Sequence, residues 1–272
     1  MTGAGAPGRA VGRAAGVWRE AARSWPMPQS IVDSAPEPRA TLEPEMFRWR
    51  PEVDAAQPMR PSRVRALEAL PAGGSVLDVG VGAGASSFGL ANKAGLITGV
   101  DRLPDMLLAF EETALELGIP VRAVLGAWPE AAEVVDPADV AVCHHALYAV
   151  EDLEGFVAAL TARARRRVVV ELSVHPPLTA LNPLLEELHG FSRSDWPVAD
   201  VAQAVVAEMG LAVEREDIVL PPRRREITPE WVAFLRRRLY VGPDRDAQIE
   251  AFLGSYEPQH ETIAALWWPG GA

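Results

Sequence analysis

The middle of the chain alternates between short apolar runs and longer stretches with helical spacing. Five runs rich in Val, Leu and Ile predict strands, at Val76–Val79, Leu96–Val100, Val121–Leu125, Val140–Cys143 and Val168–Leu172. Apolar residues that recur every three or four positions predict helices between them, at 85–93, 103–117 and 152–164. Because strands and helices alternate at this spacing, the pattern predicts βαβ units that build a parallel sheet with helices on both faces.

The last third of the chain continues the sheet and interrupts it once. The pattern predicts helices at 179–190 and 198–209, a strand at 212–219, helices near 229–240 and 245–253, and a last strand at 262–268. Residues 221–258 are therefore expected to form a helical insertion before the last of seven strands. The predicted fold class is α/β, with a Rossmann-like, doubly wound and mostly parallel sheet.

The first 70 residues differ in composition from this core. Gly, Ala and Pro are frequent in residues 1–45, which we expect to be a poorly ordered leader or to hold a short helix over 11–24. Residues 46–70 are expected to form an N-terminal helical cap. Its helix begins at Pro61, since proline suits the first helical position. Residues 71–272 then form the main domain.

Composition narrows the classes of function. The chain has 272 residues, of which 49% are apolar and 23% charged, as in a globular protein. Its net charge of −11 argues against a general nucleic-acid binder, which needs positive charge facing phosphates. The single cysteine, Cys143, excludes an internal disulfide, and the scattered histidines indicate no metal site. No apolar run reaches the ~18 residues of a membrane span, so we expect a cytoplasmic protein without a membrane partner. The sequence does not indicate the oligomeric state.

The most informative segment joins a buried strand to a glycine-rich turn. Asp78 ends the strand and is followed by Gly80, Gly82 and Gly84. Glycines at this spacing allow a tight turn and close approach of a ligand, and a helix after the turn would offer unpaired N–H groups. The next strand ends in Asp101, whose carboxylate suits a ribose diol. Asp78 suits an ammonium group, whereas it would face the pyrophosphate of a dinucleotide.

These residues resemble the class I S-adenosylmethionine-dependent methyltransferases. The run Asp-x-Gly-x-Gly-x-Gly from Asp78 to Gly84, with Gly99-Val-Asp101 at the end of the second strand, carries the resemblance over about residues 71–220. The resemblance implies S-adenosylmethionine as cofactor and an antiparallel last strand. It also implies that the glycine loop wraps the methionine and ribose part of the cofactor, that Asp101 binds the ribose hydroxyls, and that Arg102 or Met106 packs on adenine.

The segment after the third strand departs from the pattern of that family. Many members have Gly-Asp-Ala there, and the Asp meets the adenine amino group, whereas this chain has Gly126-Ala127-Trp128. Ala127 has no side-chain acceptor, which leaves a backbone N–H of residue 127 or 128 to meet the ring. Trp128 either stacks on adenine or packs in the core, where large aromatic side chains dominate burial.

Polar residues at the ends of the fourth and fifth strands mark the expected acceptor site, since ligands of doubly wound sheets lie beyond the carboxyl ends of the strands. The fourth strand runs into Cys143-His144-His145-Ala-Leu-Tyr148, which is not the Asn-Pro-Pro-Tyr run of enzymes that methylate base or glutamine amino groups. His144 and His145 are candidate general bases, and Cys143 and His144 are candidate cofactor contacts. Tyr148, Glu171 and His175 are candidate acceptor-lining residues. Each of these has a structural alternative, such as packing, capping a helix or being a hydrogen-bonded buried carboxylate.

The sequence thus predicts an enzyme that transfers a methyl group from S-adenosylmethionine to a small organic acceptor by direct in-line displacement. A cofactor-binding protein without transferase activity, acting as a sensor or partner subunit, is the alternative, because the third-motif Asp is missing. An NAD-type oxidoreductase is a third interpretation. Six arginines at 223–225 and 236–238 could bind an acidic substrate or RNA phosphates, although a solvated helix face is the more common explanation of such a pattern. The sequence does not identify the acceptor or the methylated atom.

Overall fold

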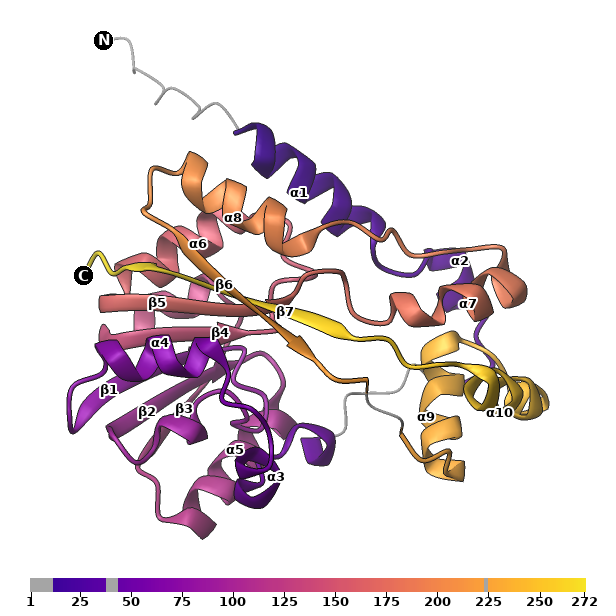
Figure 1. The fold of residues 1–272 in the computed structure, drawn as a ribbon, viewed down its shortest axis with the longest axis horizontal. Coiled ribbons are helices and arrows are strands. Elements are labelled where there is room, and N and C mark those ends of the chain that lie inside the picture. Colours follow the sequence, from indigo (N-terminus) through magenta and orange to yellow (C-terminus); the bar gives the residue numbers. More distant parts are fainter. Residues whose placement is uncertain (1–11, 38–43, 223–224) are drawn as a thin grey trace, which may run out of the picture.

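The computed structural model describes residues 12–37, 44–222 and 225–272. Seven strands form one sheet in the order β3-β2-β1-β4-β5-β7-β6 (Figure 1). Their bounds are β1 Gly74–Val79, β2 Ala94–Asp101, β3 Val121–Leu125, β4 Ala138–His144, β5 Ala164–Ser173, β6 Glu214–Leu220 and β7 Glu261–Pro269. Strands β1 to β5 pair in parallel, and β7 runs antiparallel to both β5 and β6. The predicted α/β class, the doubly wound order and the antiparallel last strand are confirmed.

One face of the sheet is covered by α1 (Arg13–Ser24), α6 (Leu153–Ala162) and α8 (Val198–Glu208), which lie together above the strands in Figure 1. Trp18 of α1 is fully buried, and its indole N–H donates to the carbonyl oxygen of Val150 at 2.6 Å. The same ring meets Trp196 edge-on, with centroids 4.9 Å apart. The N-terminal helix is therefore part of the main hydrophobic core.

The structure describes only part of the N-terminal segment for which predictions were made. The helix expected over 11–24 is present as α1. Residues 1–11 and 38–43 of the expected leader lie outside the described residues. After the second gap come η1 (Pro44–Phe47) and α3 (Pro51–Ala55). The division of the chain into leader, cap and main domain stays a prediction.

The opposite face is covered by α4 (Pro61–Ala69), α5 (Pro104–Leu117) and the short 3₁₀ helix η2 (Phe88–Leu90). We call it the α4 face. Side chains of β1, β2 and β4 pack here against these helices. Phe88 stacks on Phe110 of α5, with ring centroids 5.0 Å apart. Further short 3₁₀ helices are η3 (Glu130–Val134), η4 (Thr179–Leu181) and η5 (Pro243–Arg245).

The α-helix predicted over 85–93 is absent, so that prediction is wrong. The segment forms turns around η2. The N–H groups of Leu90 and Ala91 donate to the carbonyl oxygens three residues earlier, Ser87 and Phe88, as in a 3₁₀ helix. Only a short length of chain separates Gly84 from the start of β2, and Phe88 is held in the core by its stack on Phe110. The glycine loop is therefore not followed by the helix N-terminus that the sequence led us to expect.

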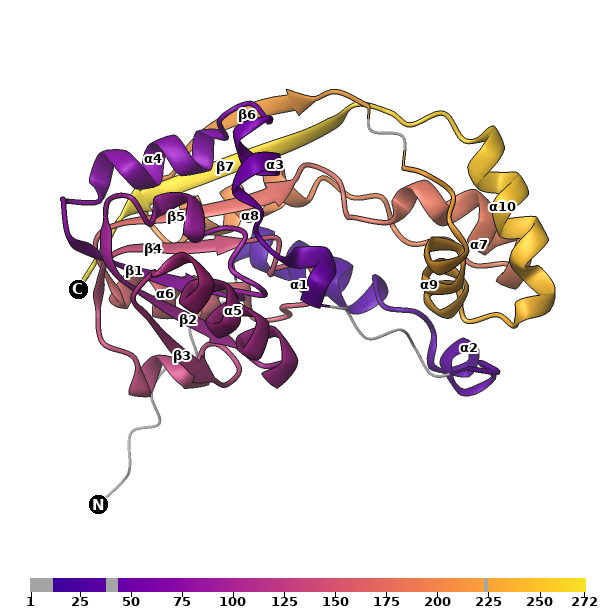
Figure 2. The same ribbon diagram turned by 90° about the horizontal axis from the view of Figure 1, so that it is seen from below.

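A separate group of helices lies beyond the carboxyl ends of β4 and β5 in both views (Figures 1 and 2). It contains α2 (Gln29–Asp33), α7 (Asn182–His189), α9 (Pro229–Leu239) and α10 (Asp246–Ser255). We call it the outer helical cluster. It has a hydrophobic core of its own, in which Leu185, Leu239 and Ile249 have no exposed area. The insertion predicted before the last strand thus packs with two segments from elsewhere in the chain.

Candidate cofactor and acceptor site

The glycine loop follows β1 in left-handed backbone conformations, with φ of +74° at Gly80, +53° at Gly82 and +88° at Gly84. A Cβ at Gly80 would lie 2.5 Å from the Cβ of Ala146, so the loop packs closely on the segment that follows β4. A Cβ at Gly82 would meet no atom within 4 Å. Gly80 is therefore required for packing, whereas Gly82 leaves open space on the outside of the loop.

Asp78 lies beneath the loop with no exposed area. Its Oδ2 accepts a hydrogen bond from the Ser86 hydroxyl at 2.6 Å, and its buried Oδ1 has no partner. Burial raises the pKa of Asp78 to about 6, against the hydroxyls of Ser86 and Ser87, and the charge of Asp101 adds to the rise. A buried carboxylate oxygen without a donor is costly, and its chemistry fits a positively charged ligand group.

Asp101 holds the other side of the loop at the end of β2. Its Oδ2 accepts from the backbone N–H of Gly82 at 2.9 Å, and its Oδ1 accepts from the N–H of Leu103 at 3.0 Å. The side chain is half-buried. The carboxylate that the sequence assigns to ribose binding is thus fixed directly beside the glycine loop.

The residues predicted to surround adenine differ in exposure. Arg102 and Ala127 are exposed, whereas Met106 is buried. The N–H of Gly126 donates to the carbonyl oxygen of Asp101 at 2.9 Å, which joins the ends of β2 and β3. The Trp128 indole N–H donates to the Phe156 carbonyl oxygen of α6 at 3.2 Å, and the ring packs on the same helix and on the main hydrophobic core. These contacts favour a packing role for Trp128.

Three polar side chains lie on the α4 face of adjacent strands. Alternate residues of a strand point to the same face, and Val76, Val142 and Val169 all pack on the α4 face. Two positions further along each strand stand Asp78, His144 and Glu171. His144 and Glu171 are register partners across β4 and β5. Asp78 pairs with Val142 and so lies two residues short of the level of the His144–Glu171 pair. The predicted residues therefore share the α4 face near the carboxyl ends of these three strands.

Glu171 is buried, with 4% of its surface exposed, and both of its carboxylate oxygens are hydrogen-bonded. Oε1 lies 3.1 Å from Arg60 Nη1 and 3.2 Å from His145 Nε2, and Oε2 accepts from the Ser62 hydroxyl at 2.5 Å. Arg60 and Ser62 come from the start of α4, far away in sequence. The predicted acceptor-lining carboxylate is thus held by the N-terminal segment and directed at His145.

His145 takes an unusual backbone conformation, with φ of +54°. Its backbone N–H donates to the Glu171 carbonyl oxygen at 2.8 Å, and its Nδ1 lies 2.8 Å from the Tyr148 hydroxyl. That hydroxyl accepts from the backbone N–H of Ser173 at 2.9 Å. The Ser173 hydroxyl in turn donates to Glu261 at 2.8 Å. Both ring nitrogens of His145 are therefore engaged.

The hydrogen-bonded side chains described above form one network, which we call the Glu171 network: Arg60, Ser62, His145, Tyr148, Glu171, Ser173 and Glu261. Burial shifts the pKa values of the ionisable groups in and beside this network in different directions. It lowers the pKa of His144 to about 4, so this ring is neutral at pH 7, and its buried Nε2 has no partner. Burial raises the pKa of Tyr148 to about 12. Burial alone would also raise the pKa of Glu171, but His144, His145 and Arg60 outweigh it and hold that pKa well below its usual range.

Two predicted site residues lie outside the network. Cys143 is fully buried in the main hydrophobic core, and burial raises the pKa of its thiol. His175 is exposed in the loop after β5, and its Nδ1 lies 2.7 Å from Asp195. Among the described residues, no three or more His, Cys, Asp and Glu side chains are grouped to hold a metal ion.

Four residues of the network were missed by sequence reasoning: Arg60, Ser62, Ser173 and Glu261. Ser173 had a detectable signal, because it stands two positions after Glu171 on the same strand and so shares its face. The others had none, because α4 and β7 reach β5 only through long-range packing and pairing. The network therefore draws on segments at both ends of the chain.

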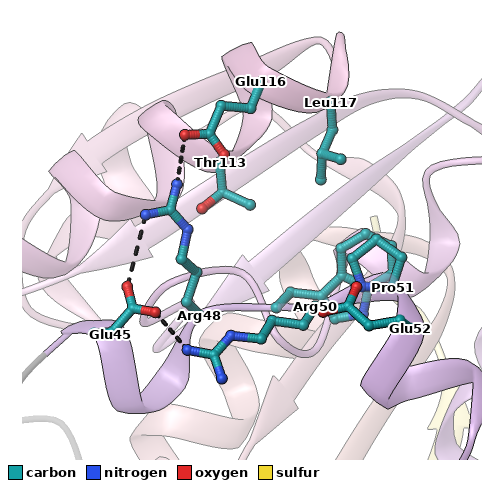
Figure 3. A pocket seen from close by; sticks show the side chains of 9 residues that line it. Glu45, Arg48, Arg50, Pro51, Glu52, Thr113, Glu116 and Leu117 are labelled. Atoms are coloured by element: carbon teal, nitrogen blue, oxygen red, sulfur yellow. Dashed lines mark hydrogen bonds and ion pairs between the residues drawn. The ribbon is translucent and has the colours of Figure 1, made fainter.

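A pocket of about 360 Å³ lies elsewhere, between η1, α3 and α5. Figure 3 shows Arg48 reaching from this N-terminal segment to Glu116 of α5 and to Glu45. The backbone of Arg48 also bridges Gly84. None of the residues of the network lines this pocket, and its ion pairs tie the N-terminal segment to the core.

Comparison with known proteins identifies the central part of the chain. Residues 76–167 match the family model described as a methyltransferase domain. No curated protein matches the chain. Within the described residues, no helix has the length and apolar composition needed to cross a bilayer.

Solved structures share the fold at low sequence identity. The YcgJ protein from Bacillus subtilis superposes with a TM-score of 0.52 and 19% identity, covering 78% of this chain and 99% of that chain. A SAM-dependent methyltransferase from Geobacter sulfurreducens in complex with S-adenosyl-L-homocysteine gives 0.49 and 21%, covering 82% and 99%. Magnesium protoporphyrin IX methyltransferase (ChlM) from Synechocystis PCC 6803 with bound SAH gives 0.49 and 16%, covering 76% and 78%. The central segment of this chain therefore matches a methyltransferase domain, and the fold is shared with solved structures at low identity.

Proposed function

We propose that the protein transfers a methyl group from S-adenosylmethionine to a small organic acceptor by direct in-line displacement. The observation that carries the proposal is the contact between the glycine loop and the segment after β4, where Gly80 packs on Ala146. That contact sets the loop beside His144, His145 and the Glu171 network. A cofactor on the loop and an acceptor at the network would then lie next to each other, as methyl transfer requires.

The residues of the loop fit the cofactor in charge and shape. The unpartnered Oδ1 of Asp78 would meet the ammonium group of the methionine part, and the open side of Gly82 leaves room for close approach. Asp101 would accept hydrogen bonds from the ribose hydroxyls. The bound cofactor supplies a methyl group on a positively charged sulfur, so the protein has mainly to align donor and acceptor.

A small acceptor is favoured over a nucleic acid because arginines of the insertion contact acidic and aromatic side chains of the protein itself. Arg236 is mostly buried and lies 2.7 Å from Asp246 and 3.3 Å from Glu37. Arg238 lies over the Phe234 ring, 5.3 Å from its centroid, and Arg225 lies over Trp231. These side chains hold the outer helical cluster together instead of forming a row for phosphates. A cytoplasmic location and the absence of a nucleic-acid partner stay predictions.

Two measurements test the proposal. Calorimetric titration should detect binding of S-adenosylhomocysteine to the wild type, and Asp101→Asn should weaken it while Asp105→Asn, on the exposed start of α5, should not. Incubation with S-adenosyl[methyl-¹⁴C]methionine and a panel of phenols, carboxylic acids and amines should then yield a labelled product. Absence of cofactor binding in the wild type would refute the assignment of the loop.

The alternative, a cofactor-binding protein without transferase activity, rests on a specific observation. Both nitrogens of His145 are already hydrogen-bonded, and His144 has too low a pKa to hold a proton at pH 7. That alternative predicts tight cofactor binding, no labelled product with any acceptor, and binding unchanged when both histidines are replaced.

A further inference from the structure

We propose that Tyr148, Ser173 and Glu261 form a proton relay that carries the acceptor's proton from His145 to the surface at the start of β7. The inference rests on the proposed function, because methylation of an O–H or N–H acceptor releases one proton. A histidine base must lose that proton before the next turnover. The His145 ring is half-exposed in the free protein, and an acceptor at Nε2 would cover that side of it. The side chains that lead away from His145 provide a route for the proton.

The relay is a continuous chain of hydrogen bonds from a half-exposed ring to an exposed carboxylate. Nδ1 of His145 lies 2.8 Å from the Tyr148 hydroxyl, which lies 3.3 Å from the Ser173 hydroxyl, which donates to Glu261 at 2.8 Å. Tyr148 and Ser173 are 7% and 5% exposed, whereas Glu261 is exposed at the start of β7. The middle of the chain is thus shielded from water, and its far end reaches water.

The same heavy-atom positions allow His145 to be protonated or unprotonated at Nδ1. The Ser173 hydroxyl gives its proton to Glu261, because a carboxylate only accepts, and the Ser173 backbone N–H points at the Tyr148 oxygen. The single Tyr148 proton therefore points either to Nδ1 of His145 or to the Ser173 oxygen. It points to His145 when Nδ1 is bare and to Ser173 when Nδ1 carries a proton. A change of protonation at Nδ1 therefore needs no movement of heavy atoms, because rotation of the Tyr148 hydroxyl accommodates either state.

The other nitrogen of His145 is the side that an acceptor can reach. Its Nε2 contact with Glu171 is 3.2 Å, longer than the contact on Nδ1. If an acceptor replaces Nε2 there, Glu171 keeps Arg60 on Oε1 and Ser62 on Oε2, so neither of its oxygens loses its last donor. The charged and titratable groups at the ring are Glu171 from β5, with Arg60 at the start of α4 on the same carboxylate oxygen, and Tyr148 and the adjoining His144 from its own segment.

In the free protein the proton of neutral His145 is on Nε2 and faces Glu171. When the acceptor takes the place of Nε2 at Glu171, this proton leaves to water and one proton enters at Nδ1 from Glu261 through Ser173 and Tyr148. The acceptor X–H bond then breaks as X takes the methyl group, and an Nε2–H bond forms. The Nδ1 proton passes to Tyr148, the Tyr148 proton to Ser173 and the Ser173 proton to the Glu261 carboxylate, which releases a proton to water. The remaining Nε2–H restores the hydrogen bond to Glu171, and one proton in total has moved from acceptor to solvent.

Glu261→Gln is the sharpest test, because a glutamine oxygen still accepts from Ser173 but cannot take up the proton. With the best methyl acceptor of the panel in dilute buffer, we expect kcat to fall on the order of tenfold or more. The KM of the acceptor and the affinity for S-adenosylhomocysteine should stay unchanged. Added imidazole buffer should restore kcat, as a substitute proton carrier. Glu257→Gln, an exposed neighbour outside the relay, is the matched control and should behave as wild type.

A second measurement needs no acceptor. In ¹⁵N-histidine NMR of the free protein, neutral His145 should carry its proton on Nε2, facing Glu171. Glu261→Gln should change the His145 ring-nitrogen resonances more than Glu257→Gln does. Tyr148→Phe should change the Nδ1 resonance, and urea denaturation should confirm that this variant is folded. Unchanged His145 ring-nitrogen resonances together with wild-type kcat in dilute buffer for Glu261→Gln would overturn the relay. Failure of the wild type to methylate any acceptor would instead refute the proposed function, and the NMR result would still decide the relay.

Discussion

Asp78 should reduce the stability of the free protein, and this can be measured without any ligand. Its carboxyl pKa is raised from an ordinary 3.8 to about 6 by complete burial. A group whose pKa is higher in the folded state binds more protons there, so stability falls as pH rises from the unfolded to the folded pKa. The loss develops between about pH 4 and pH 6 and is complete above, and it amounts to about 3 kcal/mol.

Replacing Asp78 with Asn removes the charge and keeps the shape. At pH 4 the wild-type carboxyl is mostly protonated, so Asp78→Asn should have nearly the wild-type free energy of unfolding. At pH 8 the variant should be more stable by about 1 to 3 kcal/mol, the lower value applying if the new amide is left without a partner. Urea denaturation of both proteins from pH 4 to pH 8 measures this difference, and other titrating groups cancel in the comparison.

Asp139→Asn provides a control of opposite sign. The backbone N–H and hydroxyl of Ser75 lower the pKa of Asp139 and outweigh its slight burial, with help from Arg166. Its stabilisation is therefore present at neutral pH and lost as pH falls, so Asp139→Asn should be destabilising at pH 8 and less so in acid. A stability difference for Asp78→Asn that does not grow with pH would refute our account of the buried carboxylate.

The same carboxylate should link cofactor binding to pH. If Oδ1 of Asp78 meets the cofactor ammonium, the ligand favours the ionised carboxyl, and binding near pH 6 must release protons. Affinity for S-adenosylhomocysteine should then fall as pH drops below about 6, and calorimetry in buffers of different ionisation enthalpy should detect the released protons. Asp78→Asn should be stable and yet bind the ligand weakly, which would separate the role of Asp78 in binding from its effect on folding.

Three further substitutions test the packing of the site. Gly80→Ala places a Cβ against Ala146 in a left-handed conformation and should destabilise by about 2 to 4 kcal/mol in urea denaturation. Gly82→Ala has the left-handed backbone but open space, so we expect a loss of only about 1 kcal/mol with impaired ligand binding in calorimetry. Equal stability losses in these two variants would contradict the assigned contacts. Trp18→Ala should destabilise by about 3 to 5 kcal/mol, because it empties a buried site and leaves the Val150 oxygen without its donor.

The sequence allowed the sheet to be predicted because its strands are continuous apolar runs with little competing pattern. The helix predicted at 85–93 was wrong, because apolar side chains with helical spacing occur there in a series of turns around a short 3₁₀ helix. Spacing records which side chains are buried, and Phe88 and Leu90 are indeed buried, but it does not distinguish a helix from a turn that buries the same residues. The short distance from Gly84 to β2 decided the outcome.

The candidate site likewise contains residues that could be predicted from the sequence and residues that could not. Asp78, the glycines and Asp101 could be predicted because their partners are near in sequence or lie on adjacent parallel strands. The hydrogen bonds of Glu171 to Arg60 and Ser62 span more than a hundred residues. They depend on how α4 docks on β5, which no local pattern encodes. Sequence reasoning therefore found the carboxylate and could not find what holds it.

The loop that would bind the cofactor lies within the segment that matches the methyltransferase domain, whereas most of the Glu171 network lies outside it. Residues 76–167 contain the glycine loop, Asp101 and the His144–Tyr148 segment. Every group that holds or connects His145 beyond this segment lies outside the match: Arg60 and Ser62 before it, and Glu171, Ser173 and Glu261 after it. Because the relay and the carboxylate clamp are built by pairing of β7 and docking of α4, they can vary without disturbing the loop. Substitutions outside 76–167 should therefore alter the acceptor and the pH dependence of turnover, while cofactor affinity follows the loop.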